Sequence, residues 1–148
     1  FEPGRMIAGN SGILLSEVLY VKEGEDRNFL ILDAAMNDLL RPALYDAYHD
    51  LEGVTLPARD AAQVTYDVVG PICESGDYLA RGRRLGKISD GDLIVLKSAG
   101  AYGAVMSSNY NSRPLVPEVL VNGNQYQIIR KRPSVEDILA TESLPDWL

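Results

Sequence analysis

Residues 13–33 read ILLSEVLYVKEGEDRNFLILD, and this stretch decides the class of fold. Two runs rich in Leu, Ile, Val, Tyr and Phe stand on either side of the polar segment Glu23-Gly24-Glu25-Asp26. Residues of these types favour strands, and a polar, Gly-containing turn between two such runs favours a β-hairpin. The stretch therefore predicts two antiparallel strands, at 13–21 and 28–33.

Similar runs recur along the chain and predict further strands, at 62–69, 83–88, 92–96, 118–121 and 126–130. Asn122-Gly123 separates the last two and is the strongest hairpin signal, because both residues tolerate positive φ. Helical signals are short, at 6–12, 36–40 and 101–107, with a terminal helix that Ser134 caps. Because strands do not alternate with helices, the chain is predicted to be mostly β, as an antiparallel barrel or sandwich with a few short helices.

Composition limits the classes to which the protein can belong. The 148 residues, 46% of them apolar, suffice for one domain with a real core. A net charge of −7 argues against nucleic-acid or anionic-membrane partners. No apolar run reaches the ~20 residues that cross a bilayer, and a single cysteine is typical of a reducing, cytoplasmic location. The opening residues lack an initiating Met, so we interpret the chain as the C-terminal part of a longer protein.

The single cysteine lies in Gly70-Pro71-Ile72-Cys73-Glu74-Ser75-Gly76-Asp77, where Gly and Pro end the preceding strand. Buried cysteines usually act as small apolar side chains, so a structural and a functional role both stay open on residue types alone. The neighbouring acids favour the protonated thiol, which makes Cys73 a poor nucleophile but a competent proton donor. Glu74 is able to accept a hydrogen bond from an ammonium.

Two segments carry an arginine in a setting that suits an anion. In Glu2-Pro3-Gly4-Arg5, Gly4 lets the backbone approach a ligand and Arg5 offers a planar fork for phosphate or carboxylate, although a turn with a solvated arginine is the simpler interpretation. Arg41 and Tyr45, in Arg41-Pro42-Ala43-Leu44-Tyr45, lie four residues apart, which is one helical turn if that segment is helical. They would either clamp a carboxylate or pack the arginine stem on the ring.

Three further features allow a plainer interpretation. Tyr102, in Gly100-Ala101-Tyr102-Gly103, stands between small residues that would let its ring approach a flat ligand, but a core tyrosine is also compatible. The sole histidine, His49, lies in a polar stretch and is expected to be solvated; one histidine is too little for a metal site, so no metal is predicted. Arg81-Gly82-Arg83-Arg84 is interpreted as a surface turn between strands.

Five strings resemble, in order and spacing, the C-terminal part of the diaminopimelate decarboxylase family, in the alanine-racemase-like group of pyridoxal-phosphate decarboxylases. They are Glu2 to Arg5, Arg41 to Tyr45, Gly70 to Asp77, Gly100 to Gly103 and Asn109-Tyr110-Asn111-Ser112-Arg113-Pro114. The resemblance implies a TIM barrel that carries the cofactor lysine, followed by a β domain. Residues 1–12 would be the tail end of that barrel, and residues 13–148 the β domain.

The resemblance also implies a reaction, the conversion of meso-2,6-diaminopimelate to L-lysine and CO2 in lysine biosynthesis. Arg5, Arg41 and Tyr45 would hold the distal carboxylate of this substrate. Glu74 would bind its distal ammonium, and Cys73 would supply the proton after CO2 leaves.

The cofactor implied by the resemblance is pyridoxal phosphate, bound mainly by the missing barrel. Glu2 would pair with the pyridinium nitrogen of its ring. Pro3, Gly4 and Arg5 would lie at the cofactor, where Gly4 and Arg5 cradle its phosphate. Tyr102 would contact both cofactor and substrate.

The implied assembly is a homodimer in which the cysteine turn of one subunit enters the neighbour's site. The lysine that carries the cofactor is not among Lys22, Lys87, Lys97 and Lys131, so the chain alone would be inactive. Two alternatives stay open: an ornithine- or arginine-type decarboxylase, which would carry Asp where Glu74 stands, and a non-catalytic binding or regulatory module of the same fold.

Overall fold

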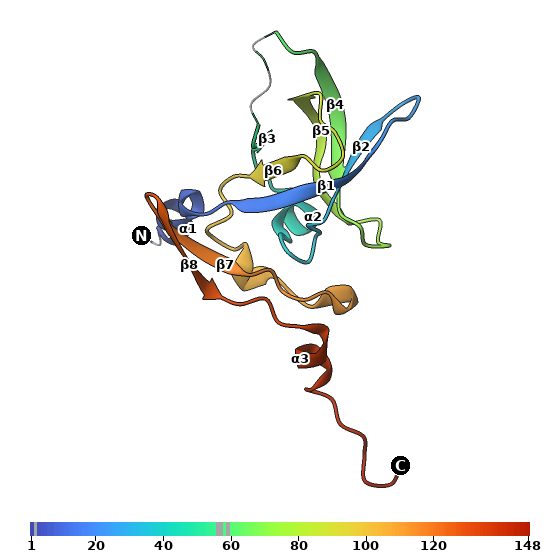
Figure 1. The fold of residues 1–148 in the computed structure, drawn as a ribbon, viewed down its shortest axis with the longest axis vertical. Helices are drawn as coiled ribbons and strands as arrows, with labels where there is room; N and C mark the ends of the chain where they lie inside the picture. Colours follow the sequence, from blue (N-terminus) through green and yellow to red (C-terminus); the bar gives the residue numbers. More distant parts are fainter. Residues whose placement is uncertain (2, 56–57, 59) are drawn as a thin grey trace. The chain divides into compact units, whose positions relative to one another are not determined.

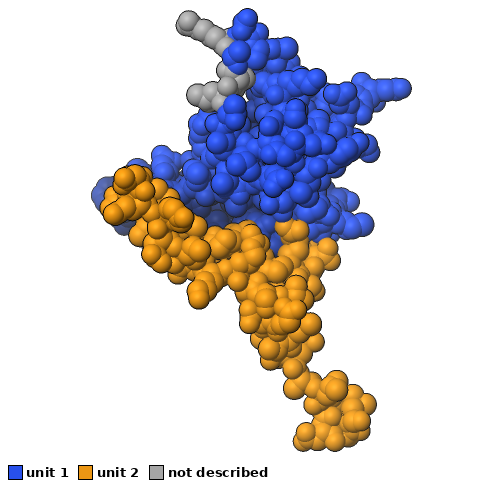
Figure 2. Space-filling model, in the orientation of Figure 1, with its two compact units in different colours: residues 1–107 blue, residues 108–148 orange. Residues whose placement is uncertain are grey.

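The computed structural model describes residues 1, 3–55, 58 and 60–148. Two compact units make up the chain, residues 1–107 and residues 108–148, which Figure 2 shows in blue and orange. None of the helices in the described ranges is long and apolar enough to cross a membrane.

A six-stranded sheet forms the body of the first unit (Figure 1). Its order is β3-β6-β1-β2-β4-β5, and the edge strands β3 and β5 also contact each other, so the sheet is a nearly closed barrel. The strands are β1 (Leu14–Lys22), β2 (Asn28–Leu32), β3 (Leu51–Gly53), β4 (Gln63–Val69), β5 (Tyr78–Gly86) and β6 (Leu93–Leu96). The mostly β class predicted from the sequence is confirmed.

The hairpin that opens the sheet forms as predicted, with Val21 opposite Leu30 and Lys22 opposite Phe29. One strand pair departs from the predicted antiparallel arrangement, because β2 and β4 run parallel. Parallel neighbours need a long crossover connection, and the segment between these two strands supplies it, since it first forms a helix and then crosses to β3 at the other edge of the sheet.

The core lies inside this curved sheet. Along β1, buried and exposed positions alternate, so that Ser16 and Val18 are buried while Leu15 and Leu19 are exposed. Such alternation is what a strand with a single buried face requires. The fully buried side chains include Val18, Leu30, Leu32, Val68, Leu79, Ile94 and Leu96.

Two expectations about the polar residues of this unit are wrong. The arginines at 81, 83 and 84 lie within β5, which begins at Tyr78 rather than at residue 83, and not in a turn between strands. A bulge allows this, because Gly82 takes φ +60 and donates its backbone N–H to Asp67 at 2.7 Å. His49 is only 4% exposed instead of solvated, and its Nδ1 lies 2.9 Å from the carbonyl oxygen of Lys97.

The helix expected at 36–40 begins later, as α2 (Arg41–Tyr45). Asp38 accepts a hydrogen bond from the backbone N–H of Ala35 at 2.9 Å, which holds the preceding residues in a turn. Short acidic side chains commonly compete with helix formation in this way. Pro42 then lies in the first turn of the helix, where its missing N–H costs nothing.

The first residues of the chain are tied to the loop after β6. Residues predicted as a helix form α1 (Gly4–Ala8) and η1 (Gly9–Ser11), and the later segment forms only η2 (Ala104–Met106). Gly100 donates to the Gly9 carbonyl at 3.0 Å, and Ala99 donates to the Gly12 carbonyl at 2.9 Å. A methyl group on Gly100 would overlap the carbonyl oxygen of Ala8.

We therefore expect Gly100→Ala to lower the free energy of unfolding by about 1–3 kcal/mol, as overpacking against backbone usually does. Chemical denaturation of the protein would measure the loss. Gly4→Ala is the matched control, because a methyl group there meets no atom within 4 Å. Equal stability of both variants would contradict the close packing at residue 100.

The second unit contains a hairpin and one capped helix. Strands β7 (Glu118–Asn122) and β8 (Gln125–Arg130) pair as predicted, but the two loop residues are Gly123 and Asn124, one position later than expected. Gly123 has φ +59, the conformation that this turn demands of its glycine. The other elements are η3 (Tyr110–Ser112) and α3 (Val135–Leu139), and Ser134 caps α3 as predicted, in a capping box with Asp137.

Candidate functional site

Helix α2 brings an arginine into contact with two tyrosine rings. The guanidinium carbon of Arg41 lies 5.8 Å from the ring centre of Tyr45, one turn along the helix, and 5.6 Å from that of Tyr102. Both distances lie within the range of cation–π attraction. The structure thus joins two segments that are far apart in sequence. We call Arg41, Tyr45 and Tyr102 the arginine cluster.

The turn that carries Tyr102 is strained. Tyr102 has a backbone φ of +59°, which residues other than Gly rarely adopt. A methyl group on the next residue, Gly103, would overlap the carbonyl oxygen of Ala99. Strain of this kind persists only where the surroundings enforce it, and it is common at ligand sites. The ring that results is 46% exposed instead of being packed in the core.

No acceptor for the Arg41 side chain is found in the described part of the chain. Its contacts are the faces of the two rings, which leave the five N–H donors of the guanidinium available. Tyr45 is 62% exposed, so its hydroxyl is accessible at the same place. The two interpretations of Arg41 and Tyr45 are therefore compatible, because the arginine stacks on rings and still offers donors to an anion.

Arg5 lies on α1, and its side chain is exposed. Across the described residues, no hydrogen bond or ion pair joins it to the arginine cluster; the connection between the two is through the backbone, where Gly100 is bonded to Gly9. Pro3 precedes the helix and is exposed. Glu2, predicted to pair with a pyridinium nitrogen, lies outside the described residues.

The cysteine turn, residues 70–77, presents Cys73 to solvent rather than burying it. Glu74 is exposed beside it, and its carboxylate accepts a hydrogen bond from the backbone N–H of Gly76 at 3.0 Å. Between the described atoms of this turn and the arginine cluster we find no hydrogen bond, ion pair or ring contact. The thiol is thus accessible from outside.

Sequence reasoning gave no role to the last residue of the turn, Asp77. Its side chain is only 4% exposed, and it accepts hydrogen bonds from the backbone N–H groups of Met36 and Ile72, each at 2.7 Å. The signal in the sequence is a short acidic residue at the end of a Gly-Pro turn, where such side chains often bind backbone N–H groups.

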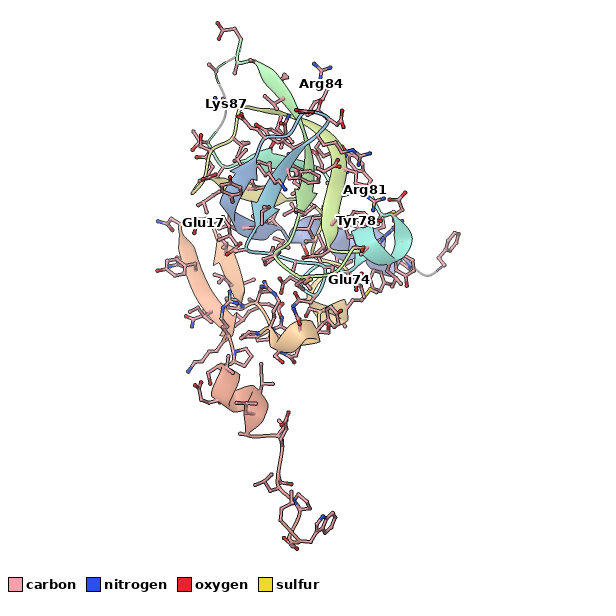
Figure 3. All side chains as sticks on the ribbon, turned by 90° about the vertical axis from the view of Figure 1, so that its right-hand side faces the viewer. Glu17, Glu74, Tyr78, Arg81, Arg84 and Lys87 are labelled. Carbon is pink, nitrogen blue, oxygen red and sulfur yellow. The ribbon has the colours of Figure 1, made fainter. Side chains whose placement is uncertain are left out.

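Glu74 and Asp77 also line an open depression of about 890 Å³ between the cysteine turn, β2, β4 and β5. Figure 3 shows Glu74, Tyr78 and Arg81 on the same face, and the guanidinium of Arg81 lies 3.6 Å from the ring centre of Tyr78. Among described residues, the arginine cluster does not contribute to this depression. Glu74 therefore lines this depression, whereas Arg41 does not.

None of the described side chains forms a group of three or more His, Cys, Asp or Glu able to hold a metal ion. Lys97 is engaged in ion pairs with Glu52 at 2.9 Å and Asp50 at 3.6 Å. The hydrogen bond to Glu52 is the largest cause that raises the pKa of Lys97 above its ordinary value. A lysine that forms a covalent link to an aldehyde must lose its proton first, so Lys97 is unsuited to that role.

Comparison with known proteins shows what this chain is similar to. Residues 6–100 match the family model of the pyridoxal-dependent decarboxylase C-terminal sheet domain. A diaminopimelate decarboxylase of Zymomonas mobilis is 54% identical over 148 residues, which are 100% of this chain and 34% of that protein.

Two solved structures are also similar. A diaminopimelate decarboxylase of M. jannaschii in complex with L-lysine has a TM-score of 0.91 and 33% identity over 97% of this chain and 32% of that one. The enzyme of Helicobacter pylori, complexed with L-lysine, has a TM-score of 0.84 and 40% identity over 93% of this chain and 33% of that one. The present chain spans about a third of the length of the relatives it matches.

Proposed function

Because this chain belongs to the family of pyridoxal-dependent decarboxylase C-terminal sheet domains, we propose that it is the C-terminal part of an enzyme that converts meso-2,6-diaminopimelate to L-lysine and CO2. The 54% identity to the Zymomonas mobilis enzyme supports this substrate. Residues 1–12 are the end of the cofactor-binding barrel in this proposal, and residues 13–148 are the β domain.

The observation that carries the proposal is the arginine cluster. Diaminopimelate has an ammonium and a carboxylate at the end that does not react, and the enzyme must recognise both groups to choose the correct end. Arg41 supplies N–H donors for which we find no acceptor among the described residues, and the hydroxyl of Tyr45 lies one helical turn away. A planar guanidinium forms two parallel hydrogen bonds to a carboxylate. The cluster therefore binds the distal carboxylate, with Arg5 as a second cation.

The cysteine turn supplies the remaining groups. The Glu74 carboxylate binds the distal ammonium, and the Cys73 thiol donates a proton to the carbon from which CO2 has left. Both side chains are exposed, and among the described residues neither forms a hydrogen bond, ion pair or ring contact with the arginine cluster of its own chain. This geometry supports a homodimer in which the turn enters the neighbouring subunit's site.

The chemistry of Gly4, Arg5 and Tyr102 fits pyridoxal phosphate. Arg5 is an exposed guanidinium suited to a phosphate, the backbone at Gly4 is open, and Tyr102 presents an exposed ring on a strained turn. When bound, the cofactor supplies an electron sink for the electron pair released as CO2 leaves. Glu2 and Pro3 would adjoin it, and the barrel would supply the lysine that holds it.

Decarboxylation assays of the full-length protein test the proposal directly. We expect CO2 and L-lysine from meso-diaminopimelate, with kcat/KM more than about 100-fold above that for ornithine or arginine. Neither of these two substrates has a distal carboxylate, so the groups that would bind one are left without a partner. Higher kcat/KM for ornithine or arginine would favour that type of decarboxylase instead. Inactivity on all three substrates with the cofactor bound would support a non-catalytic module.

A further inference from the structure

The carboxylate of Asp77 is enclosed between two loops and uses both of its oxygens. Oδ1 accepts from the N–H of Met36 and Oδ2 from the N–H of Ile72, each at 2.7 Å. One N–H belongs to the loop before α2 and the other to the cysteine turn itself. With 4% of its surface exposed, the carboxylate is shielded from water that would compete for these bonds.

The space between this carboxylate and Gly70 is filled. A methyl group on Gly70 would overlap the Asp77 carboxylate and would lie 2.7 Å from the Cα atom of Ala35. The backbone of Gly70 is also bonded to the end of the turn, since its N–H donates a hydrogen bond to the carbonyl oxygen of Asp77 at 3.2 Å. Glycine at position 70 is therefore what allows Asp77 to reach Met36.

Both anchored N–H groups lie next to functional segments. Ile72 directly precedes Cys73 and Glu74. Met36 lies in the turn that Asp38 closes on Ala35, and this turn leads into α2 and Arg41. The two hydrogen bonds of the Asp77 carboxylate therefore attach the cysteine turn to the loop before α2.

We propose that Asp77 is a positioning residue, which fixes the cysteine turn so that Cys73 and Glu74 reach their places in the neighbouring site. This inference rests on the proposed function. Asp is required because its carboxylate only accepts hydrogen bonds, whereas the amide of Asn would turn an N–H₂ group toward one of the two N–H donors. Glu would place the same carboxylate about one bond farther from its backbone, so the two hydrogen bonds at 2.7 Å would not form in the same positions.

A double-mutant cycle in the full-length enzyme tests this role. Asp77→Asn is expected to lower kcat for diaminopimelate by roughly 100-fold, as the misplacement of a reacting group by about 1 Å does. In a Cys73→Ala background the same substitution should lower kcat by less than about threefold, because no thiol is left to misplace. KM should rise in both backgrounds, because Glu74 moves with the turn. An equal loss of kcat in both backgrounds would overturn the proposal.

Asp67→Asn is the matched control. Asp67 lies on β4 and, like Asp77, its carboxylate accepts a hydrogen bond from a backbone N–H, that of Gly82 at 2.7 Å. It also forms an ion pair with Arg27 at 3.3 Å. The substitution Asp67→Asn should leave kcat unchanged. If Asp77→Asn does not fold, Gly70→Ala displaces the same carboxylate and should show the same background-dependent loss of kcat.

Amide hydrogen exchange supplies a measurement that does not depend on activity. Asp77→Asn should speed exchange at Ile72 and Met36, while Asp67→Asn should speed it near Gly82 only. Unchanged exchange at Ile72 and Met36 would refute the anchoring role. If the wild-type enzyme proves inactive on diaminopimelate while the exchange result holds, the proposed function fails and the anchor stands.

Discussion

Replacement of Cys73 by Ala in the full-length enzyme is expected to lower kcat by roughly 100- to 10,000-fold, the contribution typical of a general acid. The absorbance of the bound cofactor should stay intact, since the thiol is exposed and its removal leaves no cavity in the core. Steady-state kinetics and an absorbance spectrum measure both effects. Unchanged turnover would remove the proton-donor role.

Ser75→Ala is the matched control for this substitution. Ser75 is exposed in the same turn, two residues from Cys73, so its loss perturbs the turn without removing the proton donor. Wild-type kcat is expected. A large loss of kcat would show that any change in the turn is harmful, and the effect of Cys73→Ala would then not identify an acid.

Mixed subunits extend the same prediction to the proposed dimer. We expect Cys73→Ala subunits, and subunits that lack the cofactor lysine, to have little activity by themselves. If the cysteine turn enters the neighbour's site, mixed dimers contain one site with both groups intact, so partial activity should return on mixing. Absence of any recovery, with subunit exchange verified, would favour sites built within a single chain.

Arg41→Ala is expected to raise KM for diaminopimelate by roughly 10- to 100-fold, the loss that corresponds to a hydrogen bond with a charged group. The effect on the melting temperature should be small, because the guanidinium contacts exposed rings rather than the core. Steady-state kinetics and thermal unfolding separate the two outcomes. A large loss of melting temperature with unchanged KM would show that Arg41 only packs against the tyrosines.

Two further variants sharpen this test. Arg41→Lys keeps the charge but loses the planar fork, so KM should stay well above that of the wild type. Arg84→Ala removes an exposed arginine of β5 that Figure 3 places away from Glu74, and it should change neither KM nor melting temperature.

Local sequence signals predicted the elements whose structure is determined locally. The β1–β2 hairpin, the β7–β8 hairpin and the Ser134 cap depend on residues close in sequence, and all three form. The parallel pair of β2 and β4 depends on a long connection that no local pattern reports. β3 has three residues, too few for a pattern, and the burial of His49 results from tertiary packing.

The candidate site divides in the same way. Arg41 and Tyr45 are spaced by one helical turn, and α2 makes their segment helical, although the sequence predicted a helix only at 36–40. The contact of Arg41 with Tyr102 joins distant segments, so it required the fold. Asp77 was part of a motif in the sequence, but its partners, Met36 and Ile72, are backbone groups that side-chain identity does not reveal.

The close packing of Gly70 against Asp77 and Ala35 has a consequence for how this protein can vary. Enlarging position 70 displaces the acid and also meets the Cα atom of Ala35. A library that randomises these three sites one at a time should recover almost only the starting residues. Simultaneous randomisation is the route by which a different combination can be reached.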